Sequence, residues 1–172
     1  MFKMKKPAYA LAAIVTLSAC AGSFPQTAAE MKAMAATSPL VATETYTVAR
    51  SASSVTANLR RLSAQCLNRT IETQHTYRQT QFGPQSITFL SRYDTTVRAS
   101  GTGAELAMRM TPIRGSVNEP KEGYIFFVAT VAAAGSGATV THYQGSIGAG
   151  AFSDSVKQWA NGATPTCPPM PR

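Results

Sequence analysis

The sequence is short of the side chains from which most enzyme sites are built. Its 172 residues include two histidines, eight carboxylates and one tryptophan, and charged residues make up only 14%. No H-x-x-x-H or C-x-x-C spacing occurs, so no local pattern places metal ligands together. His75 and His142 lie among polar neighbours in alternating segments, which is typical of half-exposed histidines in a sheet. We expect no metal and no cofactor.

The few acidic residues are spread along the chain. A hydrolase with paired carboxylates would need the fold to bring together Glu72, Asp94 or Glu105 from separate segments. Cross-strand ion pairs are the simpler prediction, because the same segments carry four arginines, Arg78, Arg92, Arg98 and Arg109. There is no G-x-S-x-G motif, and the stretch GSIGAG at 145–150 lacks the order and the lysine of phosphate-binding loops. We assign no catalytic residue and predict that the protein is not an enzyme.

The apolar run near the N-terminus is too short to span a bilayer. Pro7 to Ala19 is uncharged for about 13 residues, whereas a spanning helix needs roughly 20. Lys3, Lys5 and Lys6 precede it, and a basic region followed by an apolar region is the layout of a secretory signal peptide. Residues 1–19 are therefore expected to be removed from the mature protein.

The residues that end this run, Leu17, Ser18, Ala19 and Cys20, resemble the lipobox of bacterial lipoproteins. The resemblance implies that the Cys20 thiol carries a diacylglycerol and that the new N-terminus is acylated. Two or three acyl chains are enough to hold a protein stably on a membrane. In Gram-negative lipoproteins an Asp after the cysteine is the usual inner-membrane retention signal. Ala21 stands there, which implies the outer membrane, with the domain facing the periplasm. The alternative is an ordinary signal peptide, cut near Ala19 or Ala21, that leaves Cys20 unmodified.

The chain has only three cysteines. If Cys20 carries lipid, Cys66 and Cys167 remain in a compartment that favours disulfides. Cys66 continues the apolar stripe of a predicted helix, and Cys167 lies in a proline-rich tail that needs fixing. We predict a Cys66–Cys167 disulfide; the alternative is two buried, reduced thiols.

The basic excess of the chain is scattered. The formal charge is +8, and removing the three signal lysines from 16 basic residues leaves 13 against 8 acids, or +5. Among the basic residues of the mature chain, only Arg60 and Arg61 are adjacent. They are interpreted as part of a solvated helix face; the alternative is a docking point for an acidic partner. Nucleic-acid binding would call for a clustered basic stripe with interleaved aromatic residues, so we expect no nucleic-acid partner.

Periodicity predicts one folded domain over residues 43–172. The segment 20–42, rich in Ala, Ser, Thr and Pro, is interpreted as the lipidated cysteine and a flexible tether, in which the good helix formers of AAEMKAMAA allow a short, loosely held helix. Residues 50–68 place apolar side chains on one helical face, at Val55, Leu59, Leu62 and Cys66. The other predicted elements are strands at 43–49, 69–81, 85–99, 104–110, 124–134 and 138–148, a loop at 111–123 and a helix at 149–162. The strand at 124–134 is apolar on both faces, as expected of a central strand or one covered on both sides.

This order of elements predicts the α+β class, an antiparallel sheet of about five to six strands with two helices packed on one face. It resembles helix-grip-type envelope modules in element order alone. The leading functional hypothesis is a membrane-anchored envelope lipoprotein, non-catalytic, whose domain binds an envelope protein or polymer. The alternative is a ligand-binding module whose apolar pocket, between helices and sheet, is lined by Phe89, Tyr93, Phe126 and Trp159.

Overall fold

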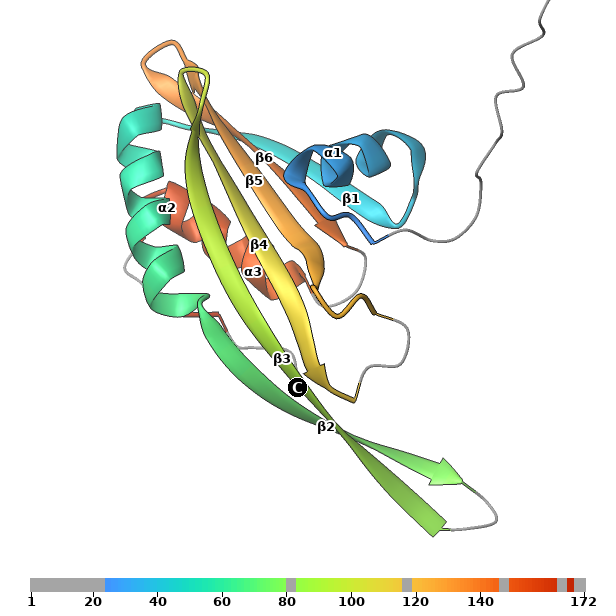
Figure 1. Ribbon diagram of the computed structural model, residues 1–172. Helices are drawn as coiled ribbons and strands as arrows, with labels where there is room; N and C mark the ends of the chain where they lie inside the picture. Colours follow the sequence, from blue (N-terminus) through green and yellow to red (C-terminus); the bar gives the residue numbers. More distant parts are fainter. Residues whose placement is uncertain (1–23, 80–82, 116–118, 146–148, 164–166, 169–172) are drawn as a thin grey trace, which may run out of the picture.

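The computed structural model describes residues 24–79, 83–115, 119–145, 149–163 and 167–168. The elements are α1 (Ala28–Thr37), β1 (Val41–Val48), α2 (Ala52–Cys66), β2 (Arg69–Gln79), β3 (Gly83–Ser100), β4 (Gly103–Arg114), β5 (Tyr124–Ala134), β6 (Gly137–Gly145) and α3 (Gly150–Ala160). The strands form one antiparallel sheet in the order β1-β6-β5-β4-β3-β2 (Figure 1). The predicted α+β class is confirmed, but the described part of the chain has three helices where the sequence predicted two.

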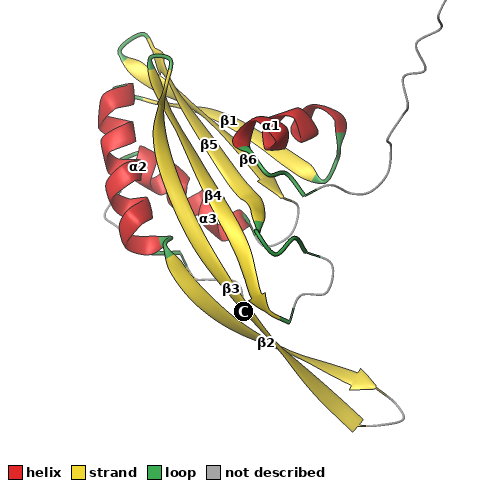
Figure 2. Cartoon of the chain, viewed as in Figure 1, coloured by secondary structure: helices red, strands yellow, loops and turns green. Residues whose placement is uncertain are grey.

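The strands β2 to β6 form a meander in chain order, and β1 adds to its far edge beside β6. The chain therefore passes from one edge of the sheet to the other between β1 and β2, and α2 makes this crossing (Figure 2). The crossing places the apolar face of α2 over the middle of the sheet.

Helix α2 follows the predicted apolar stripe. Val55, Leu59, Leu62 and Cys66 are all buried, and the Ser51 side chain accepts a hydrogen bond from the backbone N–H of Ser54 at the start of the helix. Such a cap satisfies one of the backbone donors that a helix start leaves free.

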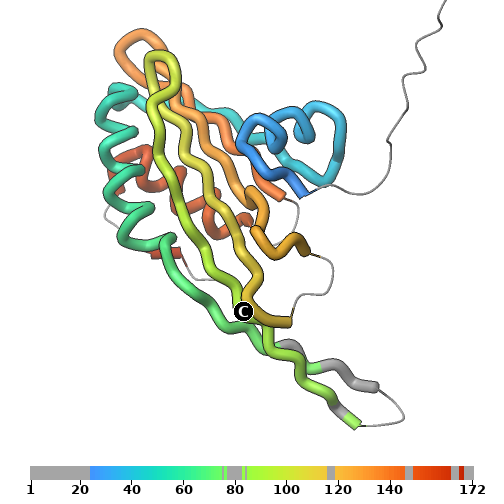
Figure 3. The backbone as a smooth tube through the Cα atoms, in the orientation of Figure 1, coloured from blue at the N-terminus to red at the C-terminus, as the bar shows by residue number. Residues whose placement is uncertain are grey.

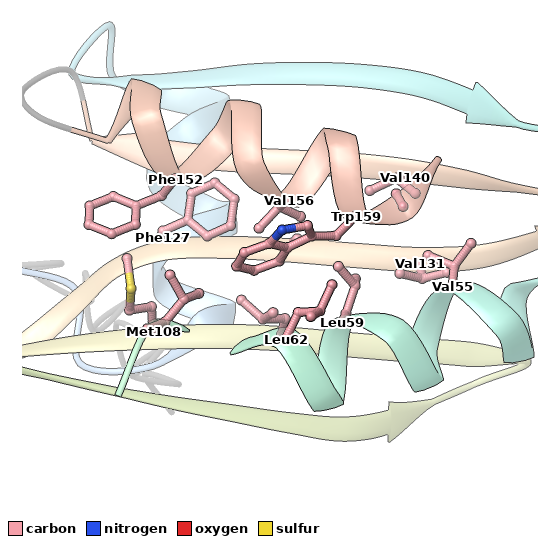
Figure 4. Close-up of a cluster of buried hydrophobic side chains, with 14 of the residues drawn as sticks. Val55, Leu59, Leu62, Met108, Phe127, Val131, Val140, Phe152, Val156 and Trp159 are labelled. Carbon is pink, nitrogen blue, oxygen red and sulfur yellow. The ribbon is translucent and has the colours of Figure 1, made fainter. Parts of the chain in front are cut away.

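The main core lies where α2 and α3 meet the sheet (Figure 4). Large side chains from α3 and from the sheet are fully buried there, among them Phe127, Phe152 and Trp159. Met108 and Met110 of β4 point into the same cluster, as the alternation of that strand predicted. Removing this much apolar surface from water is the dominant favourable contribution to folding.

Helix α1 corrects the prediction of a flexible tether over 20–42. Met31 is 2% exposed and packs with Val41, Ile125 and Val128 in a second apolar cluster. The Thr27 side chain caps the helix, and apolar contacts to β1, β5 and β6 hold it, so residues 24–42 belong to the domain. The good helix formers of AAEMKAMAA are consistent with α1, but the helix is not loosely held, because Met31 packs against Val41, Ile125 and Val128.

Strands β2 and β3 extend beyond the rest of the sheet as a two-stranded ribbon (Figure 3). The last pair between β3 and β4 is Leu90 with Arg114, while β3 continues to Gly83 paired with Gln79 of β2. The loop predicted at 111–123 therefore begins later than expected, because β4 continues to Arg114 past a bulge at Leu90/Ser91. At about 3.4 Å per residue, the ribbon extends roughly 24 Å past β4.

Candidate functional site

The first described residues are built into the sheet near the start of β5. The Phe24 ring lies 4.5 Å from the Tyr124 ring, centroid to centroid, and the Ile125 N–H donates to the Pro25 carbonyl at 2.7 Å. The Arg109 guanidinium donates to the Gln26 carbonyl at 2.6 Å and to its side-chain oxygen at 3.3 Å. The chain is therefore fixed from Phe24 onward, four residues after Cys20.

Side-chain hydrogen bonds of Thr27 and Glu30 fix the start of α1 directly after this segment. The Glu30 N–H donates to the Thr27 hydroxyl oxygen at 3.1 Å, and the Glu30 carboxylate accepts from the Gln26 N–H at 2.7 Å. Thr-x-x-Glu is a known signal of a helix start, so the spacing of Thr27 and Glu30 could have revealed α1 in the sequence.

A buried polar network centres on His142 and was missed by the sequence analysis. His142 is 0% exposed, which corrects the prediction of a half-exposed sheet histidine. Its Nε2 lies 2.9 Å from the Tyr46 hydroxyl and its Nδ1 lies 2.8 Å from the Ser153 hydroxyl of α3. A neutral imidazole offers one donor and one acceptor, so both ring nitrogens are satisfied. The side chain of His75, in β2, lies outside the described residues.

Burial sets the protonation of this network. It lowers the pKa of His142 to about 4, although Glu44 nearby opposes this shift. Burial also raises the pKa of Tyr46. Ser153, His142 and Tyr46 have the residue types of a proton relay, but Ser153 is 3% exposed, so its hydroxyl cannot reach a substrate. We therefore interpret the network as a link between α3 and the sheet.

The three carboxylates considered for a hydrolase lie in separate ion pairs. Glu72 pairs with Arg114 at 3.7 Å, Asp94 with Arg92 at 2.7 Å, and Glu105 with Lys32 of α1 at 2.6 Å. Of the expected arginine partners, only Arg92 appears in these pairs. The fold thus gives these carboxylates no shared site for acid–base catalysis.

Three of the four residues expected to line an apolar pocket, Tyr93, Phe126 and Trp159, belong to the packed main core instead. The rings of Tyr93, Phe126 and Phe152 lie 5.8 to 6.0 Å apart, and Trp159 is 0% exposed. The fourth expected lining residue, Phe89, is partly buried in β3. A surface hollow of about 500 Å³ lies along α3, lined partly by polar side chains such as Asp154 and Gln158.

The two cysteines expected to pair are joined in the structure. Cys66 at the end of α2 and Cys167 form a disulfide with a Cα–Cα distance of 5.1 Å, within the usual range for such a bond. Arg69 also donates to the Pro168 carbonyl at 2.9 Å. Arg60 and Arg61, the adjacent arginines, are exposed on α2.

Comparisons with known proteins assign no relative to the chain: no protein-family model, curated protein or solved structure matches it. Among the described residues, no helix is both long and apolar enough to cross a membrane. The same part of the chain holds no group of three or more His, Cys, Asp or Glu side chains placed to bind a metal ion. Cys20, the predicted lipid attachment site, lies outside the described residues.

Proposed function

We propose that this protein is a lipoprotein of the bacterial cell envelope, anchored by Cys20, whose domain acts by binding another envelope component. The observation that carries this proposal is the position of Cys20. The lipobox-like residues Leu17 to Cys20 end four residues before Phe24, which is already fixed to β5. A lipid on Cys20 would hold a complete folded domain directly at the membrane surface.

The interior of the domain supports binding at its surface. Tyr93, Phe126 and Trp159 are buried in the core, where the alternative function would need them to surround a ligand. Glu72, Asp94 and Glu105 lie in separate ion pairs, which supports a non-catalytic role. The partner is proposed to be an envelope protein or polymer that contacts the outside of this domain.

Replacing the anchor cysteine tests the proposal. Cys20→Ser should move the protein from the membrane to the soluble fraction and abolish fatty-acid labelling, because no thiol remains to carry the diacylglycerol. Ser23→Ala, outside the lipobox-like residues, is the matched control and should stay on the membrane. Membrane association of Cys20→Ser equal to that of Ser23→Ala would contradict the proposal.

A substitution of Ala21, the residue after the cysteine, tests whether the protein is localised to the outer membrane. The lipoprotein resemblance implies that Ala21→Asp should shift the protein from the outer to the inner membrane in a density gradient, with fatty-acid labelling unchanged. Crosslinking in intact cells should then capture the partner with the original protein and lose it with Ala21→Asp, if that partner lies at the outer membrane.

A further inference from the structure

The exposed large hydrophobic side chains of the described residues lie toward the same end of the sheet, spread from the β1 edge to β3. Leu40 is 62% exposed, Ile113 is 54% exposed and Ile87 is 44% exposed. In this antiparallel sheet, β1, β3 and β5 begin at the end where β2, β4 and β6 finish. Leu40 directly precedes β1, Ile87 lies near the start of β3 and Ile113 near the finish of β4. We call this the Phe24 end.

The N-terminal segment enters the fold at this same end. Phe24 contacts Tyr124, the first residue of β5, and Pro25 accepts a hydrogen bond from Ile125. Ile125 packs with Val41, the neighbour of Leu40 in the chain, so Leu40 lies beside the entry point. The predicted anchor and the exposed apolar side chains thus share one end of the molecule.

The length of chain outside the described fold limits how far this end can lie from a membrane. Four residues lead from Cys20 to Phe24, and a fully extended chain of that length spans at most about 14 Å. The polar headgroup region of each leaflet is roughly 5 to 8 Å thick. An anchor at Cys20 therefore leaves a gap of less than about 10 Å between Phe24 and the headgroups.

We propose that the Phe24 end rests on the membrane, with the Leu40 and Ile113 side chains in contact with the lipid interface. This inference depends on the proposed function, because the acyl chains on Cys20 bring the two surfaces together. The exposed side chains of Leu40 and Ile113 would then contact the same membrane in which the acyl chains are inserted. Apolar side chains at a membrane interface add buried area to the affinity of a lipid anchor.

The β2–β3 ribbon sets the tilt of the domain. Pairing between β3 and β4 ends at Leu90, and the ribbon beyond it carries exposed polar side chains, among them Gln74, Gln85 and Ser86, which are costly to bury in the hydrocarbon region of a bilayer. The ribbon must therefore run along the headgroups, with the strands oblique to the membrane. In Figure 1 the start of β1 and the end of the ribbon lie on the right of the molecule, and the finish of β4 lies between them, farther to the left.

Charge at the Phe24 end is mixed, which points to an apolar contact. The exposed Lys121 and Glu122 are adjacent and of opposite sign. Arg114, beside Ile113, pairs with Glu72 at 3.7 Å. Because opposite charges alternate here, anionic lipids should not be required, and the contact should persist at high salt.

Depth-dependent quenching tests this orientation on the full lipidated protein. Single cysteines are introduced as Leu40→Cys or Ile113→Cys and labelled with a polarity-sensitive fluorophore. The control is Ser136→Cys, in the β5–β6 turn at the opposite end of the sheet. The proteins are reconstituted in phosphatidylcholine vesicles containing a phospholipid with a nitroxide on its headgroup. The probes at 40 and 113 should lose about half of their fluorescence, and the probe at 136 should be unaffected.

A paired substitution separates orientation from anchoring. With a reporter at Glu122→Cys, the double variant Leu40→Asp and Ile113→Asp should still sediment with vesicles but lose its quenching. The matched control is Thr102→Asp with Ala133→Asp, at the opposite end of the sheet, which should keep both properties.

The two readouts assign each failure to one proposal. Equal quenching at positions 40, 113 and 136, or quenching at 136 alone, would overturn the orientation while the protein still sediments. Failure of the original protein to sediment with vesicles would overturn the lipid anchor itself.

Discussion

His142 is a basic side chain that the fold keeps out of water. Burial lowers its pKa to about 4, and the ordinary value is 6.5. The charged groups near it are Glu44, which opposes the shift, and Lys157, which adds to it. Glu44 and Lys157 also pair with each other across the outside of the network. The folded protein therefore stabilises the neutral form of the His142 imidazole.

This residue makes stability depend on pH in a defined direction. The unfolded chain binds a proton at His142 below pH 6.5, whereas the folded protein resists protonation until about pH 4. Protonation thus favours the unfolded state, and the free energy of unfolding should fall by up to roughly 3 kcal/mol as the pH drops through this range. Urea unfolding followed between pH 7.5 and pH 4 measures the effect.

Two variants assign this slope to His142. His142→Gln should be less stable at neutral pH, because Tyr46 and Ser153 lose a well-placed partner, but its stability should change less between pH 6.5 and pH 4.5. Gln65→Asn, at an exposed position of α2 that does not titrate, is the control and should keep the slope of the original protein. An unchanged slope in His142→Gln would show that other groups cause it.

Helix α1 is an element whose place depends on a few contacts. Only Met31 is buried within it, and the Lys32–Glu105 ion pair joins it to β4 at 2.6 Å. A partly exposed ion pair near the surface contributes about 1 kcal/mol, so most of the docking energy comes from the apolar cluster around Met31.

Truncating Met31 should therefore release α1. Met31→Ala is expected to lower the free energy of unfolding by about 2 to 4 kcal/mol and to open residues 24–42 to limited proteolysis. Ala33→Ser, on the exposed side of the same helix, is the control and should change stability by about 0.5 kcal/mol or less. Equal protease resistance in both variants would contradict the assignment of α1 to the domain.

At the scale of the whole molecule, the disulfide ties the end of the chain to the first half of the domain. Cys66 and Cys167 are 101 residues apart, and in the chain-entropy model a loop of this size contributes up to about 4.7 kcal/mol. Reduction should therefore lower the urea midpoint substantially without changing the fold of the sheet.

The two cysteines should differ when replaced singly. Cys167→Ser removes only the cross-link and should match the reduced original protein, because Cys167 is exposed. Cys66→Ser should cost about 1 to 3 kcal/mol more, since it also places a hydroxyl at a position that is 2% exposed. Unfolding of the three proteins in reductant is the measurement, and equal midpoints for the two variants would contradict the placement of Cys66 in the core.

Period and spacing within the sequence were enough for the elements whose signals are local. The apolar residues of α2 from Val55 to Cys66 repeat every 3.6 residues, and those of β4 alternate every two. Each pattern depends only on which face of that one element is buried, so the sequence was enough to predict the α+β class. The apolar character of β5 on both faces indicated a central strand or one covered on both sides; β5 lies inside the sheet, and its Ile125 and Val128 also pack with α1. Cysteine counting identified Cys66 and Cys167 as the pair, because only these two remain once Cys20 is set aside.

The features that involve contacts between distant segments were decided by the tertiary structure. Helix α1 has a weakly amphipathic, alanine-rich sequence, and its position follows from the uncovered apolar face of β5 that Met31 fills. His142 stands among polar residues in the sequence, but Tyr46 from β1 and Ser153 from α3 meet it from distant parts of the chain. Local patterns describe how one segment folds, whereas burial and pairing depend on which segments the topology brings together.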